Sequence, residues 1–498
     1  MAECGVRSEE CGREGLASDI LRPSAAYGPF AFIRARLRLA LRVCLIVPIG
    51  LALLLSPDLG SAQETFLDDV LEGFDDTRPV VRTEAPAEPA KTASIDLTGS
   101  IALSAVSNVH QHQSSTGTDY SGLSRLRFTL DLGVDARFSR TWDATVRGRG
   151  FHDAAYGIQG RENYTREVLD SLANEAELRE AFVRGKVLPS LDVKVGRQIV
   201  VWGKSDNLRV TDVLNPLDNR EPGMVDIEDL RIPLSMGRVD WYAGRWSVSA
   251  IAIPEIRFNK NPPFGGDFYP STMPPPREVI PEDGGDNTEY AFALNGILTG
   301  WDLSFYAARI FNDQPSARVP SSFPFPPIEL VHDRISMQGA ALNAAAGNWL
   351  LKTEAARFTG LRFAARPDRT FDRIDALLGV EYTGFTEITV SLEAVHRRLM
   401  DFEAVLEAAP DRAQEDEVQA ALRFQRDFLH DRLQLTFLAL RGGWNSRDGA
   451  MQRISLKYAL TDSLAVTGGF MNYGAGEKQE VRNIGKNDRV FCEAKYSF

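Results

Sequence analysis

From about Ser94 to the C-terminus, apolar and polar residues alternate one by one along extended stretches of the chain. The clearest stretch is Arg125 to Phe138, RLRFTLDLGVDARF, in which apolar residues occupy every second position. A period of two is typical of a β-strand with one apolar and one polar face. A strand that crosses a bilayer needs ~9–11 residues, whereas an ordinary strand averages ~5–6. The length and repetition of the pattern therefore favour membrane-spanning strands over a soluble β-rich domain, which is the alternative.

The connections between these stretches alternate in length. Short turns are expected near residues 139–140, 189–190, 244–245, 300, 347–348, 384–385, 430–431 and 461–462. Longer polar segments lie between them, at about residues 110–122, 152–176, 203–235, 256–287, 312–331, 360–371, 400–416, 442–449 and 474–487. Short turns on one side and long loops on the other are typical of an outer-membrane barrel with an even number of strands. We therefore predict an all-β fold over residues 95–498, a transmembrane antiparallel up-and-down β-barrel of about 18 strands, with 16 to 20 compatible with the pattern.

Composition agrees with this fold. The chain has 498 residues, of which 44% are hydrophobic, and a net charge of -12. A barrel strand needs only its outward face to be apolar, and a closed barrel satisfies all its backbone groups within lipid. The acidic charge argues against nucleic acid as a partner, because it repels phosphate.

The N-terminus has the features of a secretory signal peptide. Arginines at 34, 36, 38 and 42 precede the apolar run Val43 to Leu55, and the small residues Gly60-Ser61-Ala62 follow it. We expect residues 1–62 to be removed by cleavage after Ala62, with the first residues as an over-extended start. An uncleaved anchor is the alternative, although the run is shorter than the ~20 residues of a membrane helix.

Residues 63–94 form a separate leader. Apolar residues from Phe66 to Phe74 recur at helical spacing with acidic residues between them, and a linker rich in Pro and Ala follows. We expect a short periplasmic amphipathic helix and linker, which would be the contact site of any periplasmic partner.

The chain ends with RVFCEAKYSF, in which Tyr496 and Phe498 share the apolar phase. A terminal Phe with an aromatic residue two positions earlier resembles the last-strand signal that the outer-membrane assembly machinery reads. The expected location is the outer membrane of a Gram-negative cell, with membrane lipid and the assembly machinery as partners. The sequence leaves the oligomeric state open.

The polar face of each predicted strand would meet the barrel interior, and barrels of 16–18 strands leave an aqueous channel. The basic candidates for lining this channel in the early strands are Arg125, Arg127, Arg147, Arg149 and Lys194. Their sign hints at anionic solutes, although lumen charges also form structural ion-pair ladders.

Arg197 falls on the lipid phase of its strand, where arginine costs ~2–4 kcal/mol at mid-membrane. A bulge at Gly196 would re-aim the side chain inward. The alternative is an interfacial position in which Arg197 extends its charged end to water.

The long segment 203–235 is the best candidate for a loop that folds into the barrel and narrows it. Its candidate constriction residues are Lys204, Asp206, Arg209, Asp212, Asp218, Arg220 and Glu228. The acidic residues could pair with the basic wall, while Trp202 is expected where the strand leaves the membrane. A solvated surface loop is one alternative, and a calcium site is another that no spaced calcium motif supports.

The start of this segment resembles a family of proteobacterial outer-membrane β-barrel proteins known mainly by a domain-of-unknown-function label. The resemblance rests on Gly196-Arg197-Gln198, Trp202-Gly203-Lys204-Ser205-Asp206 and Asn215-Pro216-Leu217-Asp218, and on the leader sequence LEGFDD from Leu71 to Asp76. It implies a porin-like barrel, and it implies as an alternative a component that works with periplasmic carriers and inner-membrane exporters of lipid-like substrates.

The sequence gives no sign of enzyme chemistry. It contains no HExxH, CxxC, P-loop or GxSxG motif. His396 lies on the apolar phase of its strand, which distantly resembles the Ser-His dyad of barrel lipases, but an interfacial histidine is the simpler interpretation. We expect no catalytic site, metal or cofactor, and a porin-like channel for small solutes. The alternative is an outer-membrane component of an export or lipid-transfer system.

Overall fold

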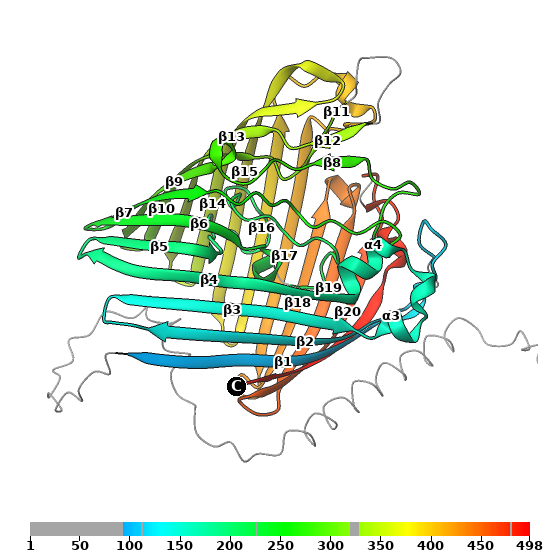
Figure 1. The fold of residues 1–498 in the computed structure, drawn as a ribbon, viewed down its shortest axis with the longest axis horizontal. Coiled ribbons are helices and arrows are strands. Elements are labelled where there is room, and N and C mark those ends of the chain that lie inside the picture. The colour runs from blue at the N-terminus through cyan, green and yellow to red at the C-terminus, as the bar shows by residue number, and fades with distance from the viewer. Residues whose placement is uncertain (1–92, 111–112, 226, 319–327, 479–480) are drawn as a thin grey trace, which may run out of the picture.

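The computed structural model describes residues 93–110, 113–225, 227–318, 328–478 and 481–498 (Figure 1). The predicted signal peptide over residues 1–62 and the predicted leader helix lie outside the described residues.

The described chain forms a barrel wall of 18 antiparallel strands. The strands are β1 (Ser94–Asn108), β2 (Gly122–Arg137), β3 (Trp142–Asp153), β4 (Asn174–Leu188), β5 (Leu191–Gln198), β6 (Leu234–Ala243), β7 (Trp246–Ile253), β9 (Glu289–Leu298), β10 (Trp301–Phe311), β13 (Arg334–Ala346), β14 (Trp349–Phe363), β15 (Arg366–Phe385), β16 (Ile388–Leu399), β17 (Asp416–Phe428), β18 (Leu433–Gly442), β19 (Ala450–Ala459), β20 (Leu464–Gly474) and β21 (Arg489–Ser497). Each pairs with its neighbour in chain order, and β1 closes the wall by pairing with β21 from Ser100↔Ser497 to Asn108↔Arg489. The predicted up-and-down barrel is confirmed.

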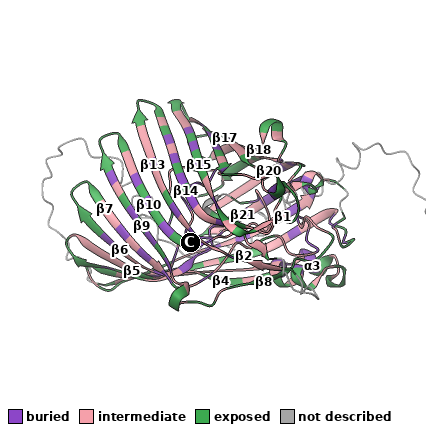
Figure 2. Ribbon diagram, turned by 90° about the horizontal axis from the view of Figure 1, so that it is seen from above, coloured by how far each residue is buried: buried purple, intermediate pink, exposed green. Residues whose placement is uncertain are grey.

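The period-two pattern of the sequence becomes the two faces of the wall. In β9, Tyr290 and Phe292 are 50% and 55% exposed, whereas Ala291 and Ala293 between them are buried. Figure 2 shows the same banding of exposed and buried residues along many strands. Large apolar side chains thus cover the outside, where lipid would satisfy them.

The predicted division into short turns and long loops is confirmed with one exception. The segment 360–371 was expected to be a loop, but β14 continues to Phe363 and β15 begins at Arg366. The error arose because polar residues interrupt the alternation there. The structure absorbs them as register shifts after Thr359 and Leu361 and buries Phe371 against Phe363, so the hairpin is longer than its pattern suggests.

The long connections carry the remaining elements. These are α3 (Ala155–Ile158), η1 (Arg161–Asn163), α4 (Arg166–Val168), η2 (Leu169–Ala173), α5 (Ile227–Leu230), η3 (Gly285–Asn287), η4 (Ala404–Glu407), η5 (Trp444–Ser446), η7 (Ile484–Lys486) and a small sheet of β8 (Arg277–Val279), β11 (Ser316–Arg318) and β12 (Glu329–Val331). None of the helices in the described part of the chain is long and apolar enough to cross a membrane.

The loop-side half of the barrel interior is packed with apolar side chains rather than left empty. Inward residues of β6 to β16, such as Met236, Ile251 and Met337, form one cluster with Val200 and Trp202 of the segment after β5. This cluster places the segment between β5 and β6 inside the barrel.

Candidate functional site

The connection from β5 to β6, residues 199–233, turns into the barrel immediately after Gln198; we call it the inner loop. Trp202 is buried and stacks on Tyr306 of β10, with ring centroids 4.7 Å apart. The Tyr306 hydroxyl accepts a hydrogen bond from the Gly203 N–H over 3.3 Å. The expectation that Trp202 marks the membrane interface is therefore wrong, because an inward aromatic partner and the apolar cluster hold it inside.

The first attachment of the inner loop to the opposite wall centres on Glu354 of β14. Its carboxylate accepts backbone N–H bonds from Lys204 over 2.6 Å, Ser205 over 2.9 Å and Thr211 over 3.0 Å. Gly203 makes this wrapping possible, because its φ of +86° suits glycine and a Cβ would lie 2.7 Å from a Glu354 carboxylate oxygen.

Glu393 of β16 extends the same attachment. It accepts a hydrogen bond from the Ser205 hydroxyl over 2.7 Å and backbone N–H bonds from Asp206 over 2.9 Å and Asn207 over 3.0 Å. Successive backbone N–H groups that converge on one carboxylate make an anion-binding nest. The motif Trp-Gly-Lys-Ser-Asp is thus a backbone turn around two wall carboxylates.

The polarity of this attachment differs from the prediction. Acidic loop residues were expected to bind a basic wall, and Glu221 does so with Arg125 and Arg127 at a second attachment. At the attachment to Glu354 and Glu393, one contact of that kind is present, between Asp206 and Lys352 of β14. The main contacts run the other way, since Glu354 and Glu393 are wall acids and the donors are loop backbone groups. Lys204 takes part through its backbone. Among the described residues, its side chain makes no ion pair.

Charged and amide side chains stabilise the inner loop internally. Asp212 accepts from Arg231 over 2.9 Å and lies 3.2 Å from Arg209. Asn215 joins the two ends of the loop, because its carbonyl accepts from the Val200 N–H over 2.8 Å and its amide donates to the Ile232 carbonyl over 2.9 Å. These contacts account for the Asn of the Asn-Pro-x-Asp sequence.

The second attachment lies on the side of β1, β2 and β20. Arg125 and Arg127 of β2 both pair with Glu221, the latter over 3.1 Å. The Tyr473 hydroxyl of β20 donates to the Pro222 carbonyl over 2.7 Å, and Met224 packs in a cluster with β1 and β21. The inner loop therefore spans the bore between two fixed points.

Electrostatics favour this second attachment. Burial alone would raise the pKa of Glu221, but the guanidinium groups of Arg125 and Arg127 outweigh burial and hold the pKa well below its usual range. Glu221 is therefore a carboxylate at neutral and mildly acidic pH, and the pairing is a permanent feature of the folded loop there.

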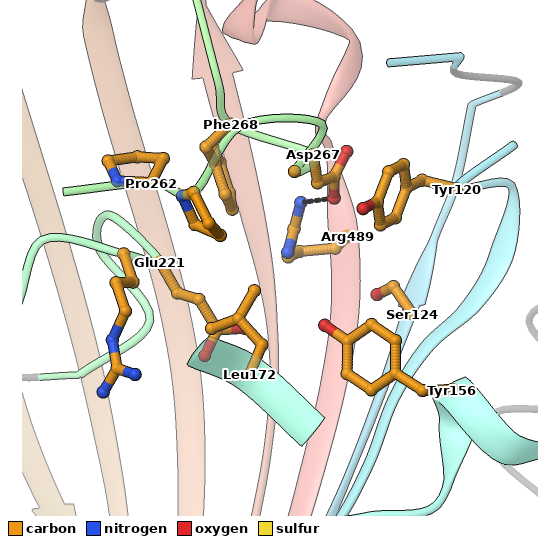
Figure 3. A pocket seen from close by; sticks show the side chains of 12 residues that line it. Tyr120, Ser124, Tyr156, Leu172, Glu221, Pro262, Asp267, Phe268 and Arg489 are labelled. Carbon is orange, nitrogen blue, oxygen red and sulfur yellow. Dashed lines mark hydrogen bonds and ion pairs between the residues drawn. The ribbon is translucent and has the colours of Figure 1, made fainter. Parts of the chain in front are cut away.

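A small cavity lies beside this attachment (Figure 3). Arg489 donates to Asp267 across it over 2.7 Å, with Tyr120, Tyr156 and Glu221 around them. Its free volume of about 20 Å³ suits a water molecule and is too small for an organic solute.

Two further sequence candidates lie where the inner loop meets β4. Arg220 contacts Asp218 over 2.5 Å and Glu175 of β4 over 2.6 Å. Arg197 donates from Nη1 to both oxygens of Glu255, over 2.7 and 2.8 Å, and from Nε to the Leu178 carbonyl over 2.7 Å. The bulge expected at Gly196 is not present, because β5 pairs with β4 and β6 through Gly196 without a register shift; Glu255 and the Leu178 carbonyl hold the Arg197 side chain instead.

The remaining basic candidates line the wall of β3 and β5. Arg147 lies 3.2 Å from Asp135 and 3.3 Å from Glu180, and Arg149 lies 2.6 Å from Asp131. Lys194 lies over the Phe182 ring at 3.6 Å. The side chain of Glu228, the last loop candidate, lies outside what the structure describes.

The C-terminal residues complete barrel closure. Phe498 exchanges backbone hydrogen bonds with Gly99 over 2.8 and 2.9 Å, and its ring lies 6.3 Å from the Tyr496 ring. Recognition of these residues by the assembly machinery stays a prediction.

Sequence reasoning missed several residues that hold the inner loop, namely Glu354, Lys352, Tyr306 and Glu221, and it missed Glu255, the partner of Arg197. A signal was available for Lys352 and Glu354, because they occupy the inward phase of β14 among apolar neighbours. Within the described residues, no group of three or more His, Cys, Asp or Glu side chains is placed to hold a metal ion.

The barrel wall is closed, its exterior is apolar, and an inward loop crosses its charged interior. These features define the class, a transmembrane β-barrel protein of the outer-membrane type. The chain belongs to the family described as protein of unknown function (DUF1302), whose family model matches residues 49–498. The predicted membership of a family known by a domain-of-unknown-function label is confirmed.

Other comparisons add likenesses of fold. No curated protein matches the chain. Solved structures with a similar barrel include Acinetobacter baumannii OccAB3, with 10% identity, a TM-score of 0.49 and coverage of 81% of this chain and 99% of that chain. Pseudomonas aeruginosa OpdK, crystallised with vanillate, has 10% identity, a TM-score of 0.46 and coverage of 81% and 98%. These are likenesses of fold alone.

Proposed function

We propose that this protein is a porin-like channel of the outer membrane through which small solutes pass, with a lumen narrowed by the inner loop. The observation that carries the proposal is the double attachment of residues 203–224, to Glu354 and Glu393 on one side and to Arg125 and Arg127 on the other. A loop held across the bore at both ends reduces the cross-section permanently. The proposal includes no catalytic role.

The charged interior supports this function. Water-filled barrels tolerate charged inward residues because lumen water hydrates them, whereas a dry core would not. The ion pairs of Arg147 and Arg149 lie on the wall between the inner loop and the short turns, and both arginines are between one third and one half exposed. This part of the interior is therefore polar and open to water.

The test is conductance in planar bilayers. The purified protein should show steady single-channel conductance without any partner. Replacing residues 206–228 by a short Gly-Ser linker should increase that conductance severalfold, because the partition of the bore is removed. A matched control shortens the outer segment 270–275, which carries none of the contacts described above, and should leave conductance unchanged.

The alternative, an outer-membrane component of an export or lipid-transfer system, predicts the opposite behaviour. Such a protein would not conduct until a periplasmic partner was added, and deletion of residues 63–90 would abolish its activity. A full-length channel that conducts alone, and equally well without residues 63–90, supports the channel. Absence of conductance from correctly folded protein would contradict it.

A further inference from the structure

The outward face of the barrel wall carries different residues at its two rims. Tryptophans lie toward the rim of the short turns, and they are Trp142, Trp241, Trp246, Trp301 and Trp349, all between 38% and 55% exposed. Membrane barrels carry such aromatic girdles where the wall meets the interface of the bilayer. Because short turns face the periplasm, these tryptophans mark the periplasmic boundary of the membrane.

Exposed arginines lie on the outward phase toward the opposite rim. Arg309 of β10, Arg357 of β14 and Arg441 of β18 each follow the first residue of their strand at the same spacing. That spacing covers roughly 26 Å of strand at about 3.3 Å per residue. At the usual strand tilt of ~35–45°, it spans roughly 20 Å of an apolar band that is ~25 Å tall. These arginines therefore lie near the membrane boundary on the side of the long loops, which face the cell exterior.

Arg441 differs from Arg357 in its partners. Arg357 lies 2.6 Å from Asp372, whereas Arg441 is exposed and makes no ion pair among the residues that the structure describes. The register places Arg441 between Ala420 of β17 and Ala450 of β19, and neither of these supplies a charge. Arg441 therefore presents its guanidinium to the membrane boundary.

Acids at the long-loop end of this part of the wall are engaged elsewhere. Asp416 of β17 contacts His396 over 2.8 Å and lies 3.4 Å from Arg398. Asp448, in the connection after β18, lies on the inward side of the strand, because a Cβ on Gly442 would be 3.1 Å from the Asp448 Cβ. The fork of N–H donors of Arg441 is thus available to an anion in the membrane.

The outward wall is hollowed beside Arg441, with a free volume of about 370 Å³; we call this hollow the outer groove. Its lining residues are Leu392, Ala420, Ala421, Leu422, Phe437, Ala439, Arg441 and Gln452. Leu392 pairs with Leu422 and Leu422 with Ala439, and the two leucines are 54% and 39% exposed. The outer groove is therefore an apolar hollow in the lipid-facing wall, with a cation at its long-loop end.

A lipid that carries both a phosphate and acyl chains matches the two parts of this surface. Arginine binds phosphate through two parallel charge-assisted hydrogen bonds. The small Ala420 and Ala439 leave the hollow between the larger Leu422 and Phe437, so an acyl chain there gains van der Waals contacts. The leaflet on the long-loop side of a Gram-negative outer membrane is made of a phosphorylated, multiply acylated glycolipid.

We propose that the outer groove and Arg441 form a binding site for one phosphorylated glycolipid of the outer leaflet, with an acyl chain in the groove and a phosphate on the Arg441 guanidinium. The site lies on the outside of the wall, so it does not depend on the proposed channel function.

The experiment titrates lipid A, the phosphorylated and acylated core of such a glycolipid, into the full-length protein in detergent. Native mass spectrometry measures the bound lipid. The wild type should bind lipid A, and Arg441→Gln should weaken the apparent affinity by about fivefold or more, because a charge-assisted contact with phosphate is lost. Arg441→Lys keeps the charge and should lose less.

Matched variants separate the charge from the groove. Arg426→Gln removes an exposed outward arginine near the short turns, where its guanidinium lies 4.6 Å from the centre of the Phe428 ring, and should leave the affinity unchanged. Ala439→Leu fills the outer groove and should weaken binding with Arg441 intact. Ala307→Leu, on the lipid-facing phase of β10, is its control and should have no effect.

Two results overturn the contact with phosphate, namely equal binding by the wild type and Arg441→Gln, and equal binding of lipid A from which the phosphates have been removed. Displacement of lipid A by inorganic phosphate at equal concentration would show a site for free phosphate. Loss of a second copy of the chain in Ala439→Leu would show a protein interface. Either of these outcomes overturns the lipid site and leaves the channel function standing.

Discussion

The Asp206 backbone N–H donates to Glu393 Oε1 over 2.9 Å, although the two residues are 187 positions apart in the chain. Glu393 belongs to the wall and Asp206 to the inner loop, so this bond joins the loop to the far side of the bore. The negative charge of Glu393 is satisfied by backbone donors that have no partner within a strand or helix, which makes the bond charge-assisted. At this attachment the position of the inner loop therefore depends mainly on an acid of the wall, whereas at the second attachment it depends on Glu221, an acid of the loop.

Substitution of that wall acid should release the inner loop. In Glu393→Gln, the amide NH₂ would face backbone N–H donors of Asp206 and Asn207, and each lost charge-assisted bond is worth about 1.5–3 kcal/mol. We expect a lower melting temperature and a noisier, larger single-channel conductance. Glu477→Gln, in an ion pair with Arg447 whose members are both 65% exposed, is the matched control and should change neither. Equal behaviour of the two variants would show that Glu393 does not hold the loop.

Gly203→Ala tests the backbone turn of the Trp-Gly-Lys-Ser-Asp motif. Its φ of +86° and the 2.7 Å approach of a Cβ to Glu354 both oppose a side chain. The left-handed conformation alone costs about 1 kcal/mol for alanine, and the clash adds to it.

Gly244→Ala is the matched control for Gly203→Ala. It has a φ of +63° in a short turn, and a Cβ there meets nothing within 4 Å. Urea unfolding should show a larger loss of stability for Gly203→Ala than for Gly244→Ala. Of the two variants, only Gly203→Ala should show a higher conductance. A loss no greater than that of Gly244→Ala would mean that the turn can move away from Glu354 without consequence.

The strands could be predicted because the signal for a strand is local. Alternation along β9 or β2 is visible in the sequence itself, and the length of each run distinguishes a membrane strand from an ordinary one. The hairpin of β14 and β15 was missed at its tip, because register shifts after Thr359 interrupt the alternation while pairing continues.

The inner loop could be placed in the barrel from its length and position, but its contacts could not be predicted. Trp202 is a plausible interfacial residue until Tyr306 is known to lie beside it, and Glu221 has no feature that connects it with Arg125. Contacts of this kind depend on which strands face each other across the bore. That arrangement follows from barrel closure and strand register, and no short sequence pattern records it.

Trp202→Ala should destabilise the barrel strongly. The side chain is buried, stacks on Tyr306 and belongs to the main apolar cluster, and such truncations cost about 3–5 kcal/mol. Trp444→Ala is the matched control, because Trp444 is 78% exposed on η5 and should contribute little. Thermal unfolding followed by circular dichroism compares them. A small effect of Trp202→Ala beside a large effect of Trp444→Ala would restore the interfacial interpretation of Trp202.

The second attachment should resist acid. Burial opposes the charge of Glu221, but Arg125 and Arg127 hold its folded-state pKa below the value of about 4.3 that a glutamate has in an unfolded chain. The folded state therefore binds this proton more weakly. The contribution of the ion pairs to stability is present above pH of about 4.3 and is lost only as the pH falls through the lowered pKa.

The measurement is single-channel conductance between pH 7.5 and about 4.5, with Glu221→Gln as the comparison. In the wild type the second attachment should persist across this range, so conductance changes that come from release of the loop should be absent. Glu221→Gln leaves the buried Arg125 guanidinium with a neutral partner, while Arg127 keeps Asp153 at 3.3 Å, and should lose about 3–5 kcal/mol across this pH range. Its conductance should be raised at pH 7.5 already. The contradicting outcome is a wild-type conductance that rises to that of Glu221→Gln before the pH has fallen to about 4.5. Glu221 would then be protonated too easily for its ion pairs with Arg125 and Arg127 to govern the attachment.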